Sequence, residues 1–235
     1  EASSSSYAEN GIKLIGDPID GVYEGETIYD LDLSNDGTRL AIGHAGYGDN
    51  TGIIRIYDYS SESGWTKTSE FVGGSSDGYA GWHVDLSSDG SRVGFSSPYA
   101  TTHNHSSGGS ATVYDISSSS RLSGARDGYP DSNADGYLEA SDSDSLFGGG
   151  FDMNADGTFI AVGSTVKGTV DVFRYIDNIG WIQYGSQISS PGTVHGASNL
   201  NFGSAVSISD DGQRVAVTST ARAKIHIYEY NSSSG

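Results

Sequence analysis

The stretch NFGSAVSISDDGQRVAV, residues 201–217, decides the fold of this 235-residue chain. It reads as a cluster of small residues, an alternating strand, an Asp-Gly turn and a second strand. The same pattern occurs three times upstream, as DLDLSNDGTRLAIG at 30–43, WHVDLSSDGSRVGF at 82–95 and FGGGFDMNADGTFIAVG at 147–163. One hairpin written four times predicts a repeat protein in which each copy is one structural unit.

Further strands follow each hairpin. Third strands with period-two alternation are expected at 52–59, 109–116, 168–175 and 224–230, and Gly-Trp-led fourth strands at 64–71 and 180–188. The Asp-Gly pairs at 36–37, 89–90, 156–157 and 211–212 lie 53, 67 and 55 residues apart. Four-stranded units of this period are typical of β-propeller blades.

The last copy lacks a fourth strand, and an orphan strand at 11–21 precedes the first copy. The orphan matches 180–188 at three positions: Gly11/Gly180, Gly16/Gly185 and Ile19/Ile188. We therefore predict an all-β fold, a β-propeller of four four-stranded blades. Strand 11–21 completes the last blade in cis, or in trans from a neighbour, which removes an exposed sheet edge. The alternative is that 11–21 finishes a blade of a preceding, absent repeat.

These units set the expected domain boundaries. A Ser-rich linker covers 1–10, the propeller 11–230 and a Ser-rich tail 231–235. Within the propeller, the blade repeats lie near 27–74, 79–125, 146–190 and 201–230 plus 11–21.

The combination of a Phe-Gly element, the Asp-Gly hairpin and Gly-x-Val-x-Val-Tyr-like third strands resembles the FG-GAP-like and WD40-like repeats. Such repeats recur in large extracellular proteins of algae and bacteria and, more distantly, in integrin α propellers. Phe-Gly stands at 147–148 and 202–203, and is degraded to Ala80-Gly81 and Thr27-Ile28. The resemblance implies a propeller fold, which hosts adhesion, lectin, scaffold and catalytic roles alike.

Composition excludes several partners. The net charge is −18, from 30 acidic and 12 basic residues, so we expect no nucleic acid and no anionic membrane as partner. The chain holds no cysteine, which rules out disulfides and thiolate metal sites, and no apolar run approaches the roughly 18 residues of a membrane span. The chain begins at Glu1 without Met, which leads us to expect a processed precursor.

The longest interval between repeats contains the strongest candidate site, DSNADGYLEASD at 131–142. Its spacing of oxygen ligands, with Gly at the sixth position, is that of a calcium loop. The predicted ligands are Asp131, Asn133, Asp135, the Tyr137 carbonyl, and Glu139 or Asp142. Calcium-binding FG-GAP repeats use the same spacing, as the resemblance implies. The alternative is a solvated Asp/Gly turn, which is how we interpret the similar Asp152–Gly157 stretch that leads straight into a strand.

Other motifs are weaker. Sequons for N-glycosylation begin at Asn104 and Asn231. His103 and His105 lack a visible third metal ligand, and no nucleophile elbow or paired acid and base is present.

The sequence therefore predicts a non-catalytic extracellular structural or adhesive propeller module, including the role of a subunit in a glycosylated surface filament. Its expected partners are copies of itself, other surface proteins and glycans, and its expected cofactor is calcium. The alternative is a lectin-like, carbohydrate-binding propeller on the cell surface or in secretions.

Overall fold

The computed structural model describes residues 15–20, 27–102, 105–122, 138–140, 143, 145–191, 201–220 and 223–231. Within this part the chain forms antiparallel sheets and a single short helix, α1 (Tyr47–Asn50). No helix of this part is long and apolar enough to cross a membrane. The all-β character predicted from the repeats is thereby confirmed; the antiparallel sheets are consistent with a propeller-like fold, and the number of blades stays a prediction.

Each hairpin repeat opens one sheet, and the strands follow in chain order. The first sheet consists of β1 (Asp30–Leu33), β2 (Arg39–His44), β3 (Ile53–Ser60) and β4 (Gly64–Val72). The second consists of β5 (Val84–Leu86), β6 (Arg92–Ser97), β7 (Ser110–Asp115) and β8 (Ser120–Arg121), with β9 (Leu138–Glu139) also paired to β7. The third consists of β10 (Phe147–Met153), β11 (Phe159–Ser164), β12 (Thr169–Ile176) and β13 (Gly180–Gln183), with β14 (Ile188–Ser189) on β12. The fourth sheet has three described strands, β15 (Phe202–Ile208), β16 (Arg214–Ser219) and β17 (Lys224–Glu229).

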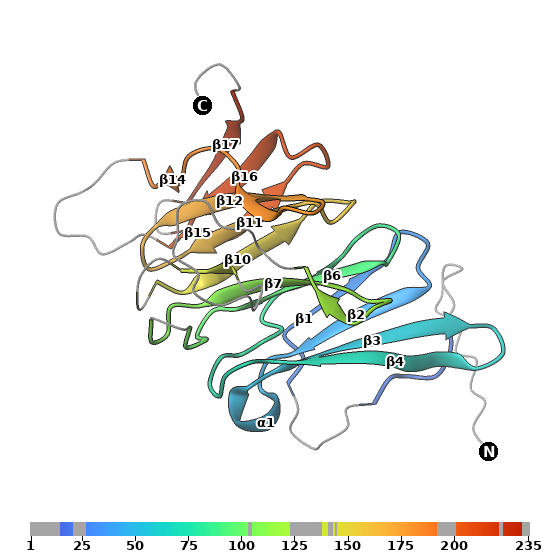
Figure 1. The fold of residues 1–235 in the computed structure, drawn as a ribbon. Coiled ribbons are helices and arrows are strands. Elements are labelled where there is room, and N and C mark those ends of the chain that lie inside the picture. Colours follow the sequence, from blue (N-terminus) through green and yellow to red (C-terminus); the bar gives the residue numbers. More distant parts are fainter. Residues whose placement is uncertain are drawn as a thin grey trace.

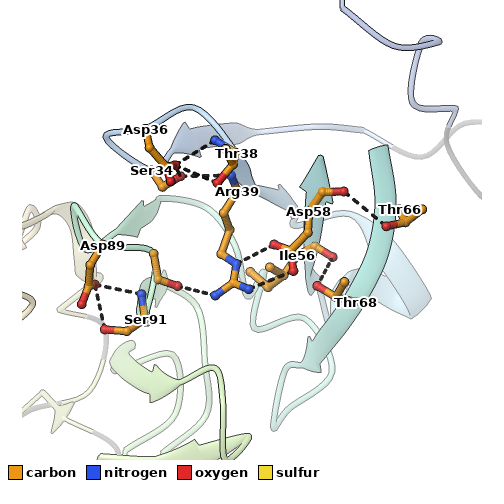
Figure 2. Close-up of polar contacts among 11 residues, drawn as sticks. Ser34, Asp36, Thr38, Arg39, Ile56, Asp58, Thr66, Thr68, Asp89 and Ser91 are labelled. Atoms are coloured by element: carbon orange, nitrogen blue, oxygen red, sulfur yellow. Dashed lines mark hydrogen bonds and ion pairs between the residues drawn. The ribbon is translucent and has the colours of Figure 1, made fainter. Parts of the chain in front are cut away.

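The Asp-Gly turn between the first two strands has the predicted chemistry. In the first sheet the Asp36 carboxylate accepts hydrogen bonds from the Thr38 N–H at 2.9 Å and from the Ser34 hydroxyl at 2.8 Å (Figure 2). Gly37 follows with φ +70°, a conformation that favours glycine. The interpretation of Asp152–Gly157 as a turn is confirmed too, because the Thr158 N–H donates to Asp156 at 2.9 Å.

Neighbouring sheets pack face to face, and the apolar core lies in three seams between them. We call these seams 1/2, 2/3 and 3/4, after the sheets that they join. In seam 1/2, Ile54 and Ile56 of the first sheet contact Val84 and Leu86 of the second. The sheets thus form an array in which the first and fourth lie at opposite ends of the molecule (Figure 1).

The closure of the last blade by residues 11–21 stays a prediction. Residues 15–20 form no strand, and Asp17–Asp20 share a groove with Tyr57, Gly64 and Trp65 of the first sheet. The Cβ position of Gly16 lies 3.0 Å from the Trp65 ring. The described part of the segment therefore lies against the first sheet, and the four described sheets form an open array.

Candidate functional site: the open ends of the array

Each sheet turns one face toward the sheet after it and the opposite face toward the sheet before it. The array therefore ends in two faces without a neighbouring sheet among the described residues. We call the outer face of the first sheet, with Leu31 and Leu33, the leading face. We call the outer face of the fourth sheet, with Ile225 and Ile227, the trailing face. These faces carry side chains that elsewhere in the repeat are buried.

The trailing face repeats the seam-forming positions of the third strands. Strand registers place Ile225 and Ile227 at the positions of Ile54 and Ile56 in the first sheet, and of Val170 and Val172 in the third. The four earlier side chains are 0–7% exposed, whereas Ile225 is 72% and Ile227 73% exposed. The fourth sheet thus presents an intact half-seam to solvent.

The leading face is the other half of such a seam. Leu31 and Leu33 occupy the positions of Val84 and Leu86 in the second sheet, which the first sheet covers. Leu31 is 55% and Leu33 48% exposed, against 1% and 6% for their counterparts. The leading and trailing faces therefore carry the two sets of side chains that pack against each other in the internal seams.

An arginine bridges the turns across two of the seams. Arg39 donates to the Gly90 carbonyl at 2.7 Å, and Arg92 donates to the Gly157 carbonyl at 3.0 Å. In seam 3/4, the Phe159 ring takes this place beside Gly212. Each of these glycines therefore has a side chain from the preceding sheet within 4 Å of its Cβ position.

This series of contacts between an arginine position and the next turn has two unused ends. They are the turn at Gly37 in the first sheet and the side chain of Arg214 in the fourth. Among the residues that the structure describes, none has an atom within 4 Å of the Cβ position at Gly37. Arg214 holds the position of Arg39, and its side chain is 66% exposed. It is already bonded to Glu229 at 2.9 Å, as Arg39 is to Asp58 at 2.6 Å (Figure 2). The trailing end thus presents an oriented arginine, and the leading end presents an open turn.

A row of aspartates links the first strands across all three seams. Asp32 accepts from the Leu86 N–H at 2.7 Å, Asp85 from the Met153 N–H at 3.0 Å and Asp152 from the Ile208 N–H at 2.6 Å. Each carboxylate satisfies a backbone donor that the first strand cannot pair within its own sheet. In the fourth sheet Ser207 takes the equivalent position.

Burial raises the pKa of two carboxyls in this row, those of Asp85 and Asp152. The pKa of Asp85 lies well above the ordinary value because the side chain is buried and the carboxylates of Asp152, Asp32 and Asp30 lie nearby. The pKa of Asp152 is raised as well, mainly by burial. Asp30 differs, because hydrogen bonds from His83, Val84 and Leu31 outweigh burial and lower its pKa. The row binds the sheets together by hydrogen bonds to backbone N–H groups.

Most of the residues predicted to bind calcium or glycans fall outside the described part of the chain. These are Asp131, Asn133, Asp135, Tyr137, Asp142 and Asn104. Glu139 is described: it lies in β9 and pairs with Ser110, in a strand that the sequence did not predict. Asn231 is exposed directly after β17. Among the described residues no cluster of three His, Asp or Glu side chains could hold a metal, so the calcium site stays a prediction.

The sequence did not predict the aspartate row or the arginine series, although both leave a signal. When the four hairpins are aligned on their Asp-Gly turns, aspartate recurs at 32, 85 and 152 and arginine at 39, 92 and 214. A polar residue that recurs on the buried side of a repeated strand indicates a contact between repeats.

No family model and no curated protein matches the chain. Solved structures do match. One is hydrazine synthase of Kuenenia stuttgartiensis, with a TM-score of 0.53 and 12% identity over 85% of this chain and 58% of that chain. Another is a Bacteroides uniformis protein named provisionally as a 6-phosphogluconolactonase, with a TM-score of 0.53 and 12% identity over 86% and 53% of the two chains. The chain thus spans little more than half the length of the structures it matches, and the likeness shows the fold alone.

Proposed function

We propose that the protein is a non-catalytic structural or adhesive module of the cell surface or extracellular space, and that its partners include copies of itself. One observation carries the proposal: the two ends of the array expose complementary halves of the seam that joins its sheets. Exposed aliphatic side chains of this kind mark an interaction surface. Calcium at residues 131–142 and glycans at Asn104 and Asn231 belong to the same proposal, on the sequence evidence given above.

The mass of the particle in solution tests the proposal. Multi-angle light scattering over a wide range of protein concentration is expected to show assemblies whose mass grows with concentration. A particle that stays at the 24.5 kDa monomer mass even at high concentration contradicts self-assembly. Thermal melts with calcium and with a chelator test the metal, and Asp135→Ala is expected to abolish any difference between them.

An aromatic cluster favours carbohydrate binding as a second candidate function. Tyr29, Tyr79, Trp82 and Tyr99 lie with ring centroids 4.8–6.0 Å apart, and Tyr29 and Tyr99 are exposed. Aromatic faces with polar neighbours are suited to stacking on sugars. A glycan array tests this candidate: retention of a sugar that Trp82→Ala abolishes supports it, and an array without binding removes it.

A further inference from the structure

We propose that copies of this chain join head to tail by strand addition. Residues 15–20 of one copy add to the fourth sheet of the next along the free edge of β17, and the leading face of the first copy covers the trailing face of the second. This interface rests on the proposed self-assembly and assigns it to particular residues.

The end of a fourth strand has a fixed place in the repeat. In the first sheet, Phe71 stands next to the last residue of β4, and its ring centroid lies 4.4 Å from that of Tyr114 of the second sheet. In the third sheet the chain continues from β13 to Ile188, which packs against the same core cluster as Tyr228 of the fourth sheet. The first and third sheets thus each end by placing an apolar side chain toward the third strand of the following sheet.

Residues 15–20 occupy this place on the first sheet. Ile19 and Tyr57 line the same groove, where Tyr57 is the counterpart of Tyr114 and Tyr228. Gly16, with φ +73°, contacts Tyr59 and Trp65, just as Gly185, with φ +79°, contacts Tyr230. The segment is therefore positioned as the end of a fourth strand, and the sheet to which that strand belongs would precede the first.

The fourth sheet has a free strand edge to which such a strand end could be added. β17 pairs with β16 on one side, and no described strand pairs with its other edge. A groove of ≈ 230 Å³ lies between the end of the third sheet's chain and β17, lined by Tyr184, Gly185, Tyr228 and Tyr230, among others. In the first and third sheets a tryptophan stacks at the equivalent edge, 5.3 Å from Tyr59 and 5.4 Å from Tyr175. The chain thus has a surplus strand end at its head and an open strand edge at its tail.

The register of the third sheet predicts the pairing. There Arg174 faces Ile182 and Thr169 faces Ser189. The matches Gly11/Gly180, Gly16/Gly185 and Ile19/Ile188 transfer this register to the fourth sheet. Asp20 then faces Lys224. This pair is opposite in charge, which favours this pairing over a slipped one.

The same docking covers the leading face of one copy with the trailing face of the other. Ile225 and Ile227 meet Leu31 and Leu33 as Ile54 and Ile56 meet Val84 and Leu86. Arg214, already oriented by Glu229, reaches the open turn at Gly37 as Arg39 reaches Gly90. One missing strand, two apolar half-seams and one unoccupied turn are all matched by the same sequence, which indicates a second copy rather than an unrelated protein. Such a heterologous contact gives a ring when it closes and a filament when it does not.

Complementation between two blocked variants tests the head-to-tail geometry. Ile227→Asp blocks the trailing face and Leu33→Asp the leading face, and neither should unfold the monomer because both side chains are exposed. We expect each variant alone to remain monomeric, and an equimolar mixture to form a 1:1 dimer through the two intact faces. The matched control Ile179→Asp, at an exposed turn, should assemble like the parent.

Several outcomes overturn the inference. Assembly that survives Ile227→Asp refutes this interface and leaves the proposed self-assembly standing, whereas a wild-type protein that never assembles removes both. Variants that stay monomeric when mixed also contradict the inference, because they indicate a symmetric interface.

A disulfide locates the added strand. The chain has no cysteine, so Asp20→Cys with Lys224→Cys introduces the only pair. Oxidation is expected to give a ladder of linked chains on a non-reducing gel. A cross-linked monomer assigns the strand to its own fourth sheet, and an absence of any cross-link rejects the register.

Discussion

Asp85 carries a carboxyl that the fold disfavours as an anion, since burial and the neighbouring carboxylates of Asp152, Asp32 and Asp30 raise its pKa well above the ordinary value. The unfolded chain releases this proton near pH 4, whereas the folded chain keeps it to higher pH. Between these two pKa values the folded state binds more protons, so this group's contribution to stability falls as the pH rises.

Asp85→Asn is therefore expected to stabilise the protein at neutral pH. The amide oxygen can still accept from the Met153 N–H, and the buried charge is gone. Urea denaturation at pH 4.5 and pH 8 should show a gain in unfolding free energy that is larger at pH 8. A difference between variant and parent that does not change with pH contradicts this account.

Asp156 gives the opposite dependence. Burial raises its pKa, but hydrogen bonds from Thr158 and Asn154 and the charge of Arg92 outweigh burial and lower it. The stability that this group contributes is present above the ordinary Asp pKa and is lost as the pH falls through the folded value. Asp156→Ala should cost about 1 kcal/mol at pH 7, the order of one hydrogen bond in a turn, and less at pH 3. An equal cost at both pH values in chemical denaturation rules out the carboxylate as the cause.

Among the strands, side chains at the same repeat position contribute very different amounts to the free energy of unfolding. Ile56 is buried in seam 1/2, and its counterpart Ile227 lies open on the trailing face. Ile56→Ala should lower the unfolding free energy by about 2–5 kcal/mol, the usual cost of such a truncation in a core. Ile227→Ala should change it by less than about 0.5 kcal/mol in dilute, monomeric protein. Equal costs, measured by urea denaturation at low concentration, would mean that the trailing face is covered in the monomer.

Ile56 and Ile227 also show which parts of the fold could be predicted from the sequence. The alternation around Ile54 and Ile225 is the same, so the strands, their order and the Asp-Gly turns were predictable from period and turn chemistry. Which apolar face is covered depends on a neighbouring sheet, and no local pattern records whether that sheet exists. Residues 15–20 illustrate the same limit: they match 184–189 at Gly16/Gly185 and Ile19/Ile188, and this match does not indicate that Asp17–Asp20 share a groove with Trp65 of the first sheet.

The second sheet shows a further limit of the sequence patterns. Its outer strand pairing is split between β8 and β9, which the chain between residues 122 and 138 separates. Calcium-loop spacing was recognisable there and strand alternation was not, because β9 spans only Leu138 and Glu139. The same residues can serve a loop motif and a sheet edge, and spacing alone identifies only the first.

For the whole molecule, charge opposes assembly and buried apolar area favours it. Each copy carries a net charge of −18, so copies repel one another at long range. The proposed pair Asp20–Lys224 acts in the opposite direction, but an exposed ion pair contributes only about 0–1 kcal/mol. The apolar contact of Ile225 and Ile227 with Leu31 and Leu33 does not depend on charge. We therefore expect screening by salt to weaken the repulsion between copies more than it weakens their ion pairing.

Association should therefore strengthen when NaCl rises from 0.01 M to 0.15 M, because the Debye length falls from about 30 Å to about 8 Å and shortens the reach of the repulsion. Light scattering at fixed protein concentration measures this as a larger mean mass at the higher salt. Ile227→Asp, which keeps the repulsion and loses the apolar contact, should stay monomeric at both salt concentrations. A mean mass that falls with salt would instead show that the opposite-charge pair, rather than the aliphatic half-seams, holds the copies together.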